Sequence, residues 1–173
     1  KGFDDPIAPR IWPKLTWAYG MVGSNLKVFV EKLRKYIGDD IPIHGMGFAA
    51  AEGFFAMATK LDSHDGVLLP HTLFFEFLPI NDDEDDVEET TPLLINQLEL
   101  GKKYELVVSN FSGLYRYRME DVVQVTGMHN NTPTIEFLYR RNLGMNLANE
   151  KTTTEMVDMA AKQSADEMGN EFV

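Results

Sequence analysis

The sequence predicts an α/β part followed by a β-barrel-like part. Apolar residues recur at helical spacing between Ser24 and Gly38, and short apolar runs suited to strands flank this amphipathic helix. From Leu93 onward, short apolar segments alternate with turn residues, which is typical of a small barrel or a curled sheet. We therefore expect an α/β segment, a β-barrel-like segment and a third segment over residues 1–90, 91–141 and 142–173.

In the first part, the helix is expected to begin at an N-cap Ser24, to end at Gly38 and to cover a sheet. The apolar run Ile41–Phe48 predicts a buried strand that leads into the small-residue turn Ala49–Gly53. The aromatic-rich run Leu68–Ile80 predicts one long strand or two short ones. These elements fit the end of an α/β subdomain.

The acidic run 81–89 is expected to be a solvated loop, because it lacks the spaced ligands and the turn glycine of a calcium loop. The β-rich part that follows has four predicted strands: Tyr104–Asn110, Leu114–Met119, Val122–Thr126 and Thr134–Tyr139. Residues 142–150 are expected to form a loop. A capping box over Thr152–Glu155 then predicts a helix through about Met168.

Composition limits the classes of function. The formal net charge of −11 disfavours binding to nucleic acid or to an anionic membrane, because the field of the protein repels phosphate. The chain has no cysteine, which excludes disulfides and thiolate catalysis and is compatible with a reducing cytosol. No stretch is long enough to span a membrane. We expect a cytoplasmic protein without nucleic-acid or membrane partners and, since the sequence opens on Lys1, a piece of a longer one.

The run Tyr115–Asp121 carries the strongest functional signal. Strand alternation places the residues of this run on two faces, with Tyr115, Tyr117 and Met119 opposite Arg116, Arg118 and Glu120. Asp121 falls where the strand is expected to turn, and a carboxylate there can accept hydrogen bonds from the two hydroxyls of a ribose. From the residues alone the alternative is stronger: a solvated turn aspartate, with Arg–Glu pairs across strands.

Four blocks in order resemble one known family. They are Ile11–Pro13, Phe48–Phe55, Phe74–Pro79 and Gly113–Val125, the last followed by Phe137–Asn142 and Glu150–Thr152. These blocks resemble the Gretchen Hagen family of acyl acid–amido synthetases, the auxin-responsive family within the acyl-adenylate-forming superfamily. The resemblance implies a fragment of that enzyme fold and an ATP-dependent ligase that conjugates a small carboxylic acid to an amine such as an amino acid. It implies ATP and Mg²⁺ as cofactors.

The resemblance also implies roles for individual residues. The family pattern Tyr-Arg-x-Gly-Asp falls on residues 117–121, so Asp121 would hold the ribose, with Tyr117 and Arg118 beside the nucleotide. Glu120 stands where the pattern has glycine, and a left-handed backbone there would strain it. The second nucleotide motif falls on residues 48–52. It would place Phe48 at the nucleotide and Glu52 as the catalytic carboxylate on the magnesium side.

Arg140 and Lys151 match a stretch that joins the large domain to a small C-terminal domain, and the resemblance places both near the nucleotide. Residues 142–173 would then form the hinge and the start of that small domain. The family's first motif, a phosphate-gripping loop, has no counterpart here, so the isolated chain is expected to be inactive. Glu120, and Ala51 in place of a hydroxyl residue, favour an alternative. In that alternative the chain belongs to a degenerate, noncatalytic relative that acts as a binding or scaffold domain.

Overall fold

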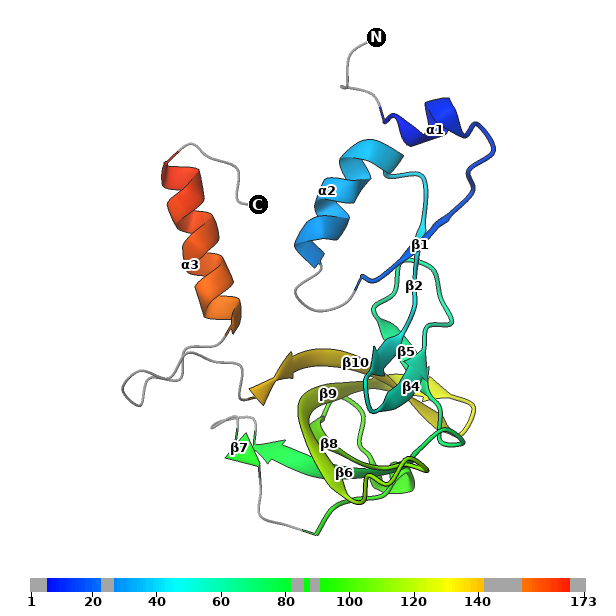
Figure 1. Ribbon diagram of the computed structural model, residues 1–173, viewed down its shortest axis with the longest axis vertical. Helices are drawn as coiled ribbons and strands as arrows, with labels where there is room; N and C mark the ends of the chain where they lie inside the picture. The colour runs from blue at the N-terminus through cyan, green and yellow to red at the C-terminus, as the bar shows by residue number, and fades with distance from the viewer. Residues whose placement is uncertain (1–5, 23–26, 82–85, 88–90, 142–153, 169–173) are drawn as a thin grey trace. The chain divides into compact units, whose positions relative to one another are not determined.

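The structure, a computed structural model, describes residues 6–22, 27–81, 86–87, 91–141 and 154–168. The chain divides into two compact units, residues 1–139 and 140–173, close to the boundary expected near residue 142 (Figure 1). Among the described residues, the first unit contains two sheets, two α-helices and a short 3-10 helix (Ile95–Gln97), and the second contains the helix α3 (Thr154–Glu167). No helix in the described ranges is both long enough and apolar enough to cross a membrane.

A small α/β layer opens the first unit. The strands β1 (Ala18–Gly20) and β2 (Ile43–Gly45) pair in parallel, and the helix α2 (Lys27–Ile37) connects them. The short helix α1 (Ala8–Ile11) contacts α2. A small apolar cluster joins these elements through Ala8, Val22, Ile37 and Ile43. The predicted amphipathic helix is therefore present, although its predicted cap Ser24 lies outside the described residues.

The end of α2 is fixed by its C-cap and by an arginine. Gly38 has a φ of +87° and donates its N–H to the Arg34 carbonyl at 2.8 Å, as a glycine that ends a helix does. The Arg34 guanidinium donates to the Ile41 carbonyl and to the Asp62 carboxylate, both at 2.5 Å. Asp62 also accepts the Ile43 N–H at 2.9 Å, so this pair ties α2 to the start of β2.

The second sheet has eight strands in the order β3-β4-β5-β10-β9-β8-β6-β7. It takes strands from both sides of residue 90, so the boundary expected there falls inside one sheet. In Figure 1 the strands β8 and β9 curve strongly. Closure of this sheet into a barrel remains a prediction. The bounds are β3 Phe48–Ala50, β4 Gly53–Met57, β5 Asp65–Leu68, β6 Phe74–Asn81, β7 Asp86–Val87, β8 Lys103–Ser109, β9 Tyr117–His129 and β10 Thr132–Arg140.

Several strand predictions need correction. The two strands expected over residues 114–119 and 122–126 are one long strand, β9. The acidic run is not all loop, because Asp86–Val87 pairs with the end of β6 as β7; residues 82–85 and 88–90 lie outside the described part. The strands predicted over 104–110 and 134–139 are present as β8 and β10.

The main core lies against the eight-stranded sheet and is rich in aromatic rings. Phe48, Phe55, Phe75, Phe77 and Tyr104 form a chain of ring contacts with centroid separations between 4.9 and 6.3 Å. Aliphatic side chains from the neighbouring strands complete this core, among them Leu68, Leu106, Val108, Val123, Val125 and Ile135. Because such burial is the main favourable term in folding, this core holds the strands that carry the candidate site.

Candidate functional site

The first part of the site is the hairpin of β3 and β4. Its turn consists of Ala51 and Glu52, and Glu52 is half-buried there. Phe48 packs between Phe55 and Phe137, with ring centroids 4.9 and 5.1 Å away, so its ring anchors the hairpin to the core. Gly47 precedes the hairpin with a φ of +99°, and a Cβ there would meet the backbone of β4 at 2.2 Å. The hairpin is thus held closely at its base.

The second part of the site is a bulge in β9. Glu105 of β8 pairs with Val122 and Val107 pairs with Arg118, so three residues of β9, numbered 119–121, lie opposite one residue of β8. Glu120 sits at the centre of the bulge with a left-handed φ of +61°, a conformation that favours glycine. Its neighbours Met119 and Asp121 are both buried. The bulge therefore interrupts the predicted alternation of faces.

The sequence suggested that Asp121 lies at a turn, but the structure does not place it at one. It follows the bulge inside β9, and its side chain is 5% exposed and makes polar interactions within the structure. A buried carboxylate needs such interactions, because desolvation of an unpaired charge is very unfavourable. Both earlier interpretations of its position, the strand end and the solvated turn, are wrong. A carboxylate held in a strand by its surroundings is well fixed in orientation.

Two Arg–Glu pairs cross the strands beside the bulge. Arg118 donates from Nε and Nη2 to the two oxygens of Glu105 at 2.7 and 2.8 Å, and the Glu105 side chain is fully buried. This hydrogen-bonded pairing raises the pKa of Arg118, and Glu120 contributes to the same shift. Arg116 contacts Glu76 in the same two-pronged way at 3.0 and 2.9 Å. The cross-strand pairs that the sequence offered as an alternative are therefore present.

The remaining predicted residues are placed as follows. Tyr117 begins β9 and is exposed. Arg140 ends β10, is exposed, and belongs to the second compact unit. Lys151 lies outside the described residues. The structure thus brings Phe48 and Glu52 together on one hairpin, and Tyr117, Arg118 and Asp121 on one strand.

Sequence reasoning missed Asn110, which lies between β8 and β9. Its Nδ2 donates to the Glu52 carbonyl at 2.9 Å, and its Oδ1 accepts the N–H groups of Ser112 and Leu114 at 3.0 and 3.1 Å. An asparagine ahead of Ser-Gly is a signal for an Asx turn, but the contact to Glu52 bridges 58 positions and leaves no local trace. Glu105 was also missed. A lone carboxylate within an apolar strand was the signal for its buried pair.

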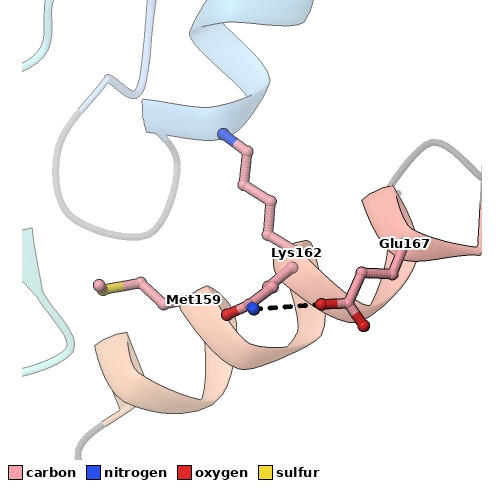
Figure 2. A pocket seen from close by; sticks show the side chains of 4 residues that line it. Met159, Lys162 and Glu167 are labelled. Atoms are coloured by element: carbon pink, nitrogen blue, oxygen red, sulfur yellow. Dashed lines mark hydrogen bonds between the residues drawn. The ribbon is translucent and has the colours of Figure 1, made fainter.

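The helix α3, the described helix of the second unit, offers less to a ligand. A hollow is lined by Met159, Lys162, Gln163 and Glu167, all from α3, with Gln163 donating to Glu167 at 3.2 Å (Figure 2). Because all four side chains come from one helix, the hollow lacks the convergent polar groups of a binding site.

Within the described part of the chain, no group of three or more His, Cys, Asp or Glu residues could hold a metal ion. In general, Mg²⁺ that arrives with a nucleotide needs only one or two carboxylates, because this ion keeps most of its waters and shares phosphate oxygens.

Comparison with known proteins identifies the family. Residues 66–140, from β5 to the end of β10, match the GH3 family central domain. The chain belongs to the GH3 family. The resemblance drawn from the sequence blocks is thereby confirmed, and the matched region holds the bulge, both Arg–Glu pairs and Asn110.

Two similar proteins are synthetases that join an acid to an amino acid or form an amide. The chain is 32% identical to jasmonoyl–L-amino acid synthetase JAR4 of Nicotiana attenuata, over 95% of this chain and 29% of that protein. It is also 32% identical to indole-3-acetic acid-amido synthetase GH3.4 of Arabidopsis thaliana, over 92% of this chain and 27% of that protein. The chain therefore spans less than a third of the length of these relatives.

A solved structure agrees with the sequence relatives. It is the AtGH3.15 acyl acid amido synthetase in complex with 2,4-DB, which is 25% identical to this chain. The match has a TM-score of 0.74 and covers 96% of this chain and 28% of that one. The sheet-rich fold described above is therefore consistent with part of an acyl acid amido synthetase.

Proposed function

We propose that this chain is part of an ATP-dependent acyl acid–amido synthetase, which adenylates a small carboxylic acid and transfers the acyl group to an amine such as an amino acid. The observation that carries the proposal is the match of almost the whole chain to amido synthetases in both sequence and structure. The geometry supports it, because the two segments that resemble nucleotide motifs lie in one compact unit, and a hydrogen bond from Asn110 to the Glu52 carbonyl ties the first of them to the loop ahead of the second.

In the proposed reaction, a carboxylate oxygen of the acid attacks the α-phosphorus of ATP and pyrophosphate leaves. The amine nitrogen then attacks the acyl carbon, the bond to AMP breaks, and the nitrogen loses a proton. No step needs a covalent bond to the protein. The protein's contribution is therefore orientation and charge stabilisation.

Asp121 is proposed to accept the two ribose hydroxyls, since one fixed carboxylate can take both hydrogen bonds. Tyr117 and Phe48 are proposed to border the nucleotide, and Arg140 and Lys151 to contribute cations near it. Glu52 is proposed to hold Mg²⁺, which supplies charge neutralisation at the phosphates. Arg118 is proposed to act beside the nucleotide through the strand that it fixes, because two of its guanidinium nitrogens are engaged by Glu105.

The test is pyrophosphate release by the full-length gene product with ATP, Mg²⁺ and a panel of carboxylic acids, followed by mass spectrometry of the products formed with amino acids. We expect release with at least one acid and an amide product with at least one amino acid. Glu52→Gln keeps the shape of the side chain but removes its charge, and it should lower the rate. Absence of release with every acid, together with absence of ATP binding, would refute the proposal.

A further inference from the structure

We infer that Asn110 is a positioning residue that fixes the turn carrying Glu52 against the loop leading into β9. Its amide side chain uses both ends for this purpose. Nδ2 donates to the Glu52 carbonyl at 2.9 Å, while Oδ1 accepts the backbone N–H groups of Ser112 and Leu114. One partly buried side chain thus connects the β3–β4 hairpin to a segment 58 positions away in sequence.

The loop that Asn110 organises is itself closed by backbone bonds. The Asn110 N–H donates to the Leu114 carbonyl at 3.0 Å, and Gly113 provides a φ of +105° that the closure requires. The Arg116 N–H then donates to the Ser109 hydroxyl at 2.9 Å. The loop is therefore tied at successive points up to Tyr117, where β9 begins. A displacement of the Glu52 turn relative to β9 would have to break the Asn110–Glu52 hydrogen bond or distort this loop.

This inference rests on the proposed function, in which Glu52 serves magnesium and the β9 strand serves the ribose. One nucleotide would have to meet both elements at once, so their separation has to be kept. Misplacement of a reacting group by about 1 Å can lower a rate on the order of 100-fold. Asn110 would touch neither the nucleotide nor the ion, and it would act only through the position of the hairpin.

The chemistry of the contact requires an amide at this position. In Asn110→Asp, the loop keeps its acceptor for Ser112 and Leu114, but the donor to the Glu52 carbonyl is replaced by a carboxylate oxygen. This variant therefore breaks the tie to the hairpin and leaves the loop's own bonds in place. Asn110→Ala removes both functions. Ser112→Ala is the matched control, because only the backbone N–H of Ser112 takes part in the contact.

The experiment is a Mg²⁺ titration of pyrophosphate release by the full-length gene product at saturating ATP and acid. We expect Asn110→Asp to raise the half-saturating Mg²⁺ concentration about 10- to 100-fold, the range seen when a supporting group behind a metal ligand is lost. Ser112→Ala should titrate like the wild type, and the thermal midpoint of Asn110→Asp should stay near the wild-type value. An unchanged Mg²⁺ dependence in Asn110→Asp would overturn the inference.

A second measurement separates this inference from the proposed function. Amide hydrogen exchange of the wild type and Asn110→Asp is followed in peptides that cover the β3–β4 turn and the centre of β8. If the wild type releases no pyrophosphate, the proposed function fails. The exchange measurement then tests by itself whether Asn110 holds the turn. Faster exchange confined to the turn supports the tie, whereas equal exchange in both proteins overturns it.

Discussion

The two sheets of the first unit bury their apolar residues to very different degrees. In the eight-stranded sheet, Phe55, Phe77 and Leu106 are fully buried in one continuous core. In the α/β layer, the cluster behind β1 and β2 is small. The rings of Trp17, Tyr19 and His44 contact one another there, and Trp17 and Tyr19 are exposed. Parallel strands are normally covered on both faces. Within this chain, the antiparallel sheet that carries the candidate site is therefore the better packed part of the unit.

The largest expected effect is a loss of stability in the eight-stranded sheet that a matched change in the α/β layer does not produce. Phe77→Ala should lower the free energy of unfolding by about 3–5 kcal/mol, because it empties a fully buried position. Phe29→Ala on α2 should cost less than about 0.5 kcal/mol, since that ring is 55% exposed. Urea denaturation of the chain measures both. Equal losses for the two variants would contradict the comparison.

The two Arg–Glu pairs allow a second comparison, between a fully buried and a partly exposed carboxylate within the same sheet. Arg118→Ala should cost about 3 kcal/mol, because it leaves the fully buried Glu105 carboxylate without its main partner. Arg116→Ala should cost about 1 kcal/mol, since Glu76 keeps some contact with water. The same denaturation experiment compares them. If Arg116→Ala lowers the free energy of unfolding more than Arg118→Ala does, burial of the carboxylate does not determine how much each pair stabilises the protein.

The bulge predicts a substitution that stabilises the protein. Glu120→Gly should raise the free energy of unfolding by about 1 kcal/mol, because a left-handed backbone strains every residue that carries a Cβ. Met128→Gly in the same strand is the control. It should destabilise by about 0.5–1 kcal/mol, as glycine does in an ordinary strand position. A Glu120→Gly variant less stable than the wild type would show that the side chain offsets the strain.

The smallest effect concerns Asp62, which ties the α/β layer together. The Ile43 N–H first, and then Arg34, lower the pKa of Asp62 below its ordinary value of 3.8. Its contribution to stability is therefore fully present above that value and is lost as the pH falls below it. Asp62→Asn should cost less than about 1 kcal/mol at pH 7, because the Asp62 side chain is 48% exposed and water screens its charge.

Thermal denaturation between pH 2.5 and 7 measures this contribution. The difference between Asp62→Asn and the wild type should shrink toward the acid end. Asp40→Asn, which removes the same charge from an exposed turn, is the control for net charge. A difference that stays constant with pH would argue against the role given to the Asp62 carboxylate.

Local patterns predicted much of the fold. Helical spacing ending at Gly38 gave α2, and apolar runs between turn residues located β8 and β10. Features that depend on contacts between distant segments were not predicted. The faces predicted for the residues around Glu120 were wrong, because the alternation rule assumes an uninterrupted strand pairing and the bulge breaks that pairing. The bond from Asn110 to Glu52 and the continuous sheet across residue 90 depend on tertiary pairing that no local signal encodes.

The proposed role of Asp121 as the ribose-binding carboxylate of an ATP-dependent amido synthetase can be tested directly. The test is calorimetric titration of the full-length gene product with ATP in the presence of Mg²⁺, with Asp121→Asn as the variant. The wild type should bind ATP, and Asp121→Asn should bind about 10-fold or more weakly, since one charged hydrogen-bonding group contributes about 1.5–3 kcal/mol. Equal affinity in two folded proteins, or no binding by the wild type, would contradict the claim.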